Sequence, residues 1–212
     1  MSRLALALSL VVTGLVVSLP NAADACGNSV RRVVDRTQEY LQRAEQLLAK
    51  GQYKKAVGAV RDVFGDRAIA AHRAGPGAHL HARAQRILAL TVARSGGDVP
   101  IGMDLGGPAQ GRKDAAIAWA VLTLRLQAGE QPSPMQTAEL AEALARQASG
   151  RAEAFDLLKG LGDGDLMPTA HGWALLAELS KQNGDVERSK QAVARCLQMN
   201  ARGVQCEVAE QA

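Results

Sequence analysis

Three of the four histidines stand close together, which raises the question of a metal site. His72, His79 and His81 fall within one stretch of ten residues. On a helix, side chains two residues apart point about 200° apart, so His79 and His81 do not face one ion together. No Cys, Asp or Glu stands beside them at ligand spacing. The sequence therefore predicts no metal here, and we expect solvated or helix-terminal histidines.

A glycine-rich segment, residues 95–113, has the separation of a phosphate-binding loop between Gly106 and Gly111. Lys113 is followed by Asp114, where that motif needs a hydroxyl side chain, and no apolar strand precedes it. The sequence therefore predicts no phosphate site. We expect instead a lid or edge loop that packs on the helices or on a partner through its apolar residues. These are Val99, Ile101, Met103 and Leu105.

No local motif of the chain assembles a catalytic set. Asp163-Gly164-Asp165 resembles part of a calcium loop, but it lacks the later glutamate at the right spacing and is interpreted as a turn. We find no Ser/His/Asp or Cys/His arrangement. The chain is therefore predicted not to be an enzyme and to carry no cofactor. The alternative hypothesis is a small-ligand carrier or enzyme with a site beneath the 95–113 loop.

Cysteine chemistry is the open question, because the chain has three cysteines and one must lack an internal partner. A disulfide between Cys196 and Cys206 is one possibility, with Gly203 letting the chain turn back. A bond between Cys26 and Cys206 is its rival. The third interpretation is that Cys196 is a small buried apolar residue on its helix.

The first 25 residues have the organisation of an export signal. Arg3 supplies the positive start, an uncharged apolar run of 16 residues extends from Leu4 to Leu19, and Pro20 ends it. Ala23-Asp24-Ala25 then offers a cleavage site. A spanning helix needs about 20 residues, so we expect cleavage rather than anchoring. The mature protein is predicted to be exported to the periplasm or the outer-membrane periphery, or to be secreted.

Cys26 follows the predicted cleavage site directly. Bacterial lipoproteins carry a lipid on a cysteine placed in this way. Ala25 fits their pattern, whereas Asp24 fits it poorly. Lipidation of Cys26 and a plain secreted protein both remain open, and a lipid on Cys26 is the only membrane contact that the sequence predicts.

The composition favours closely packed helices over a sheet-based fold. Hydrophobic residues make up 47% of the chain but aromatic residues only 3%, so the core must consist of Ala, Leu and Val. The formal charge is only +4, and basic residues form no stripe. Nucleic-acid binding normally uses such a stripe with aromatic stacking residues, so we expect no nucleic-acid partner.

The most regular stretch, residues 170–200, reads as two amphipathic helices. The apolar faces of the two helices comprise Trp173, Leu176, Ala177 and Ser180, then Val186, Ser189, Val193, Cys196 and Leu197. Gly184 is expected to end the first helix in a left-handed conformation. Asp185 is expected to cap the second.

This stretch resembles a tetratricopeptide repeat, a 34-residue helical hairpin. The positions that carry the resemblance are Trp173, Leu176, Ala177, Gly184, Asp185, Val193, Cys196 and Leu197. Ser189 departs from the usual Ala, and Ala201 stands where the family often has Pro. The resemblance implies an all-α solenoid of about four antiparallel hairpins.

We place the hairpins at about residues 30–65, 79–128, 135–160 and 169–200, within a degenerate repeat domain of residues 26–206 and before a tail at 207–212. The turn glycines are separated by 45, 54 and 34 residues, so only the last interval equals the family period. In the second hairpin, Ala115, Trp119, Leu122 and Leu126 are expected to form the buried stripe of the helix that begins at Asp114.

The resemblance also implies a function. Tetratricopeptide arrays usually bind a peptide or a partner helix on the concave face formed by the first helix of each hairpin. The residues expected to line this groove are Gln38, Leu41, Glu45 and Leu48, then His171, Ala174, Glu178 and Lys181. We therefore expect an interaction module or scaffold of the bacterial cell envelope, with a protein or peptide partner. Self-assembly by end-to-end packing of hairpins is a further hypothesis, and the sequence leaves the oligomeric state undetermined.

Overall fold

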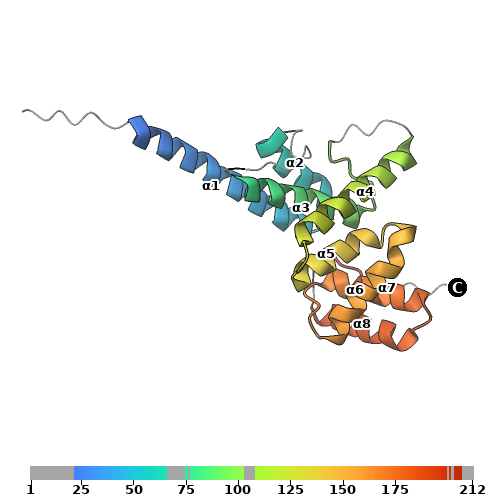
Figure 1. The fold of residues 1–212 in the computed structure, drawn as a ribbon. Coiled ribbons are helices and arrows are strands. Elements are labelled where there is room, and N and C mark those ends of the chain that lie inside the picture. Colours follow the sequence, from blue (N-terminus) through green and yellow to red (C-terminus); the bar gives the residue numbers. More distant parts are fainter. Residues whose placement is uncertain are drawn as a thin grey trace, which may run out of the picture.

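The computed structural model describes residues 22–65, 75, 77–102, 108–199, 201 and 203–206, and side chains from residue 36 onwards. This part of the chain is all-α, with eight α-helices, one short 3₁₀ turn and no strand, which confirms the all-α part of the prediction (Figure 1). The helices are α1 (Ala22–Ala49), α2 (Tyr53–Phe64), α3 (Ala78–Ser95), α4 (Ala109–Ala128), α5 (Pro134–Leu144), α6 (Arg151–Asp163), α7 (Ala170–Gln182) and α8 (Val186–Gln198).

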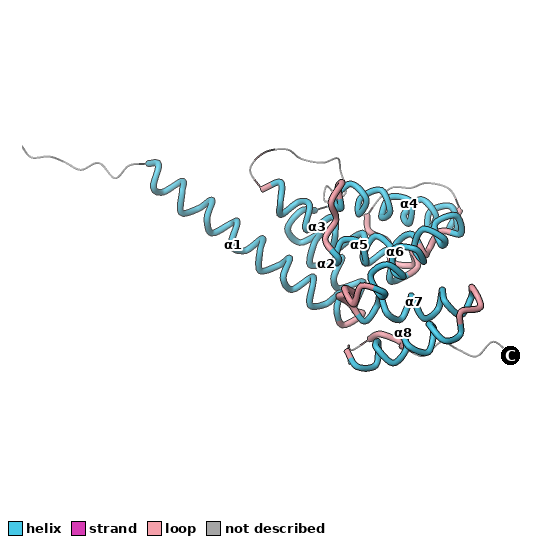
Figure 2. The backbone as a smooth tube through the Cα atoms, turned by 60° about the horizontal axis from the view of Figure 1, so that its bottom comes forward, coloured by secondary structure: helices cyan, strands magenta, loops and turns pink. Residues whose placement is uncertain are grey.

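Consecutive helices pack as pairs: α1 on α2, α3 on α4, α5 on α6 and α7 on α8. The odd-numbered helices also contact one another in order, from α1 through α3 and α5 to α7. Figure 1 shows α1–α4 in one part of the molecule and α5–α8 in the other. Figure 2 shows α7 between α8 and the α5–α6 pair. Helix α3 therefore lies between the first pair and α5.

Local signals at the last pair are confirmed residue by residue. Gly184 adopts a left-handed φ of +78° after α7. The Asp185 carboxylate accepts the backbone N–H of Arg188 at 3.0 Å and so caps α8. The Ser189 hydroxyl donates to the Ala177 carbonyl at 2.8 Å. This bond ties α8 to α7 inside their interface.

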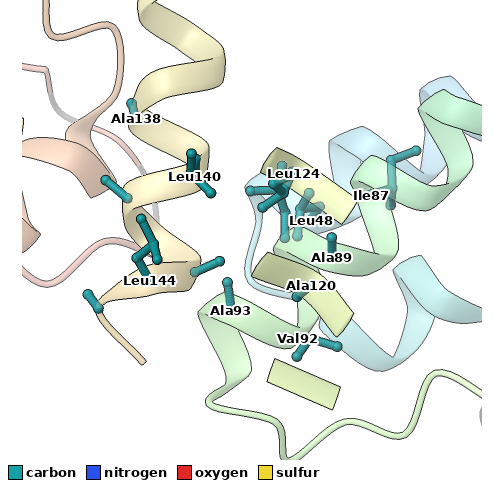
Figure 3. Packing of buried hydrophobic residues seen from close by; sticks show 14 of the residues in the cluster. Leu48, Ile87, Ala89, Val92, Ala93, Ala120, Leu124, Ala138, Leu140 and Leu144 are labelled. Atoms are coloured by element: carbon teal, nitrogen blue, oxygen red, sulfur yellow. The ribbon is translucent and has the colours of Figure 1, made fainter. Parts of the chain in front are cut away.

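The core consists mainly of Ala, Leu and Val, as the composition predicts. Small residues such as Ala44, Ala56 and Ala89 are fully buried where helices approach one another. Figure 3 shows Leu48 of α1 pointing into this core beside Leu124 of α4. Such burial contributes about 0.8 kcal/mol per buried methylene group to the free energy of folding.

Two predicted helix faces are wrong in part. On α4, Leu122 and Leu126 are 58% and 72% exposed, and Trp119 is half-buried. The opposite face is buried instead, through Ala116, Ile117, Ala120, Val121, Leu124 and Ala128. On α8, Val186 and Leu197 are exposed, and Ala192 lies in the core in their place. The reason is that α3 and α5 contact α4 on its alanine-rich side, where small residues permit close approach.

Three hydrogen-bonded arginine–glutamate pairs join the central helix α3 to α1 and α5. Arg83 binds Glu45 of α1 through Nε and Nη2 at 2.7 and 2.6 Å. Arg86 binds Glu139 of α5 through the same two nitrogens, and Arg94 binds Glu142 of α5. Both α5 carboxylates, Glu139 and Glu142, are buried. Buried charges of this kind require a partner, so the pairs fix the packing of α3 between α1 and α5.

Candidate functional site: a groove beside helix α7

Helix α7 presents four of the predicted groove residues to one cavity. Its N-terminus is fixed by Thr169, whose hydroxyl oxygen accepts the Gly172 backbone N–H at 3.0 Å. The opposite face of α7 is buried, as predicted, through Trp173, Leu176, Ala177 and Ser180. The remaining face lines a groove of about 570 Å³. It contributes His171, Ala174, Leu175, Glu178, Lys181 and Gln182.

The other walls of this groove come from four separate parts of the chain. They are Tyr53 at the start of α2, Ala93 and Arg94 at the end of α3, Glu142 and Arg146 in and after α5, and Gly203, Val204 and Gln205 near the C-terminus. The lining therefore combines apolar surface with charges of both signs. The volume of the groove lies within the range of about 300–1,000 Å³ that ligand sites occupy, and its lining is more polar than that of most small-molecule sites.

The base of the groove holds the pair formed by Arg94 and Glu142. Arg94 Nε and Nη2 donate to the two carboxylate oxygens at 2.7 and 3.1 Å. The side chains are only 11% and 5% exposed. Burial opposes the charge of Arg94, but the carboxylates of Glu142 and Glu139 outweigh it and raise the pKa of Arg94 above its usual value. The two charges neutralise each other locally.

Arg146 supplies a further cation at the same end of the groove. Its Nε donates to the Ala93 carbonyl at 2.7 Å, which fixes the guanidinium plane beside the end of α3. Arg146 is exposed, so its remaining N–H groups face solvent in the groove. Planar guanidinium groups bind carboxylates in two-point contacts.

His171 lies half-buried in this wall. Burial lowers its pKa, and the positive charges of Arg94 and Arg146 lower it further, while Glu142 acts in the opposite direction. Its imidazole is therefore neutral near pH 7. A neutral imidazole can donate one hydrogen bond and accept another.

The groove residues predicted on α1 are not part of this groove. Leu41 and Leu48 are 0% and 5% exposed and belong to the core, so their assignment to a ligand-binding surface is wrong. Glu45 is bound to Arg83 of α3, and Gln38 is exposed away from the cavity lining. The physical reason is that α3 packs directly on the face of α1 that the resemblance assigns to the groove.

Residues 203–206, which we call the strap, form the groove wall that sequence reasoning missed. A disulfide joins Cys196 of α8 to Cys206, with the two Cα atoms 5.6 Å apart. This is the first of the two pairings considered from the sequence, and Cys196 is at the same time fully buried. Gly203 at φ +82° and the two cysteines were the available signals, but they indicated a turn and not a wall.

Neither the histidine cluster nor the aspartate turn forms a metal site where the structure describes them. Within the described part of the chain, no group of three His, Cys, Asp or Glu side chains is placed to hold an ion. His79 is exposed, whereas His81 is buried with its ring 5.9 Å from that of Phe64. Asp163 binds Lys159 and Arg188, and Asp165 binds Arg195. His72 lies outside the described residues.

Several sequence predictions fall wholly or partly outside the described residues. Residues 103–107 of the 95–113 loop are among them, so the alternative site beneath that loop stays a prediction. Its first half does pack, because Val99 and Ile101 are buried in the core. Residues 1–21 and 207–212 and the Cys26 side chain are also not described. The predicted signal peptide, tail and lipidation therefore remain predictions.

Comparison with known proteins finds no matching family model, no similar curated sequence and no similar solved structure. None of the helices in the described part of the chain has the length and apolarity needed to cross a bilayer.

Proposed function

We propose that this chain is an exported tetratricopeptide-like interaction module of the bacterial cell envelope that binds a peptide or a partner helix in the groove beside α7. The observation that carries the proposal is the groove itself. His171, Ala174, Glu178 and Lys181, predicted from the resemblance, line one cavity of about 570 Å³. Binding by contacts rather than by covalent chemistry fits a lining without a catalytic set, and we propose no enzymatic activity.

The order of helix contacts supports the solenoid part of the proposal. Paired consecutive helices, with α1, α3, α5 and α7 in successive contact, are expected for stacked helical hairpins. Such arrays expose a groove along their first helices. Here α7 lines the groove along its length, whereas α3 and α5, the first helices of the second and third hairpins, contribute Ala93, Arg94 and Glu142 near their C-terminal ends.

The groove chemistry supports a peptide with both an apolar and an acidic residue. Tyr53, Leu175 and Val204 offer apolar surface. Arg146 offers N–H groups to a carboxylate, while Arg94 is already neutralised by Glu142. Complementary charge of this kind favours specificity and orientation of the bound peptide.

The Cys196–Cys206 bond supports export, because disulfides persist in oxidising compartments outside the cytosol. Intact-mass measurement of the protein recovered from its native envelope tests this part. We expect a chain that begins at Cys26, with or without the added mass of lipid. A full-length chain in the cytosolic fraction would contradict export.

Selection of a random peptide library on the purified mature chain tests the groove. We expect selected peptides to cross-link to a photoreactive side chain placed at Ala174, and Ala174→Arg to weaken their binding at least tenfold. Lys190 on the outer side of α8 is exposed and does not line the groove, so it is the matched control position. Equal cross-linking at both positions, or no loss with Ala174→Arg, would overturn the proposal.

A further inference from the structure

The strap connects the two ends of the helix array. At one end, Cys206 is bonded to Cys196 of α8. At the other, Gly203 lies against the turn between α1 and α2: a Cβ built on it would stand 3.6 Å from the Lys50 carbonyl carbon and 3.8 Å from the Gly51 nitrogen. The strap therefore crosses from the last helix pair to the first, along the side of the groove that α7 leaves open.

Among the described residues, few polar contacts hold the strap. Val204 is half-buried against the core, whereas Gln205 is exposed. Among the described residues, the backbone of the strap makes one hydrogen bond, from Val204 N–H to the Ala201 carbonyl at 3.4 Å, and that bond is local. A segment with so few contacts opens at low free-energy cost unless it is fastened. The disulfide is the fastening that the structure provides.

We infer that the Cys196–Cys206 disulfide holds the strap in place as the second wall of the peptide groove, so that a dithiol which reduces this bond opens the groove and weakens peptide binding. The inference rests on the proposed function, because it concerns the same groove. Val204 and Gln205 then contact the bound peptide opposite Ala174 and Leu175, and they contribute to its selection.

The reduction is a thiol–disulfide exchange. One thiolate of the dithiol attacks a sulfur of the Cys196–Cys206 bond, and the released cysteine sulfur takes up a proton. The second thiol of the dithiol then displaces the remaining cysteine sulfur, which is protonated in turn. The dithiol ends as a disulfide, and the chain ends with two thiols. Cys206, at 9% exposure, is more accessible than Cys196, at 0%.

Hydrogen exchange is the readout that needs no ligand. We compare the mature chain carrying Cys26→Ser before and after treatment with dithiothreitol, and a second variant that adds Cys206→Ser. The background substitution removes the third thiol and leaves the strap intact. We expect the Val204 amide, which donates the backbone hydrogen bond of the strap, to exchange severalfold faster after reduction and in the Cys206→Ser variant, with circular dichroism of the helices unchanged. Unchanged exchange of the strap would overturn the inference.

Peptide affinity is the second readout, measured with a peptide selected on the oxidised chain. We expect about tenfold weaker binding after reduction and with Cys206→Ser, and unchanged binding with Cys26→Ser alone. Faster strap exchange with unchanged peptide affinity would show that the strap does not act as a wall of the groove. The proposed function would still stand. If no library peptide binds the oxidised chain, the proposed function fails, whereas the exchange experiment still decides whether the disulfide fastens the strap.

Discussion

Helices α1 and α7 are each the first helix of their hairpin, yet corresponding residues are buried on α1 and line a groove on α7. Leu41 of α1 is the counterpart of Ala174 of α7, and Glu45 is the counterpart of Glu178. Leu41 is fully buried and Glu45 is bound to Arg83, whereas Ala174 and Glu178 line an open groove. Position within a hairpin therefore does not decide which residues meet a ligand.

The neighbouring helix decides it. α3 packs directly on α1, and Arg83 of α3 donates to Glu45 of α1. This face of α1 is therefore part of a helix–helix interface. In the described part of the chain, α7 contacts α5, α6 and α8, and its remaining face lines the groove. The strap reaches its open side but leaves room for a ligand.

Arg94→Met should have the largest effect on stability. It leaves the Glu142 carboxylate buried without its partner, which costs about 3–5 kcal/mol. The double variant Arg94→Met/Glu142→Leu replaces the pair with apolar groups and should regain most of this loss. Urea denaturation measures both. A single variant within about 1 kcal/mol of the parent would show that Glu142 finds another partner or solvent.

Leu41→Ala should destabilise the fold by about 2–5 kcal/mol, because it leaves a cavity in the core. Its counterpart change, Ala174→Leu, extends into the groove and should alter the unfolding free energy by less than about 1 kcal/mol. The same denaturation experiment compares them. Similar losses from the two variants would remove the contrast between α1 and α7.

Glu45→Gln and Glu178→Gln remove the same charge from corresponding positions of α1 and α7, so they compare an ion-paired glutamate with a groove-lining one. The hydrogen-bonded carboxylate of Glu45 raises the pKa of Arg83, but both side chains are about one-third exposed. We therefore expect a loss of about 0.2–1 kcal/mol for Glu45→Gln and less than about 0.5 kcal/mol for Glu178→Gln. The difference should shrink in 1 M salt, since the Debye length there is about 3 Å. A difference that persists in high salt would mean that packing, not charge, supports Glu45.

His171 should contribute a small pH dependence. Its pKa is lowered in the folded chain, chiefly by burial and then by Arg94 and Arg146. Below pH about 6.5 the unfolded chain therefore binds a proton that the folded chain resists, and stability falls as the pH falls. Folding free energies measured between pH 5 and 8 should show this slope in the parent, and His171→Gln should reduce it. An identical slope in both chains would contradict the lowered pKa.

The sequence was most informative where the chemistry is local. The turn glycine Gly184, the cap Asp185 and the buried face around Trp173 depend on short-range rules, and the structure contains all three. These rules predict helices and their pairing without reference to the rest of the chain.

Prediction failed where a choice between two faces depends on distant neighbours. Leu122 and Leu126 are more apolar than Ala116 and Ala120, yet the alanines are buried because close helix packing selects small residues. Leu41 was assigned to the groove because the packing of α3 on α1 is a tertiary contact that short-range sequence rules do not predict. The wall formed by Val204 depends on a disulfide whose partner the sequence left open.

The two tryptophans lie in different environments, which fluorescence can distinguish. Trp119 is half-buried on α4, whereas Trp173 is 8% exposed, with the Arg195 guanidinium 5.7 Å from its ring centre. The first should emit at longer wavelength and be quenched readily by acrylamide, and the second should emit at shorter wavelength and resist quenching. Because the chain contains only these two, a single emission spectrum separates unfolding around α4 from unfolding around α7.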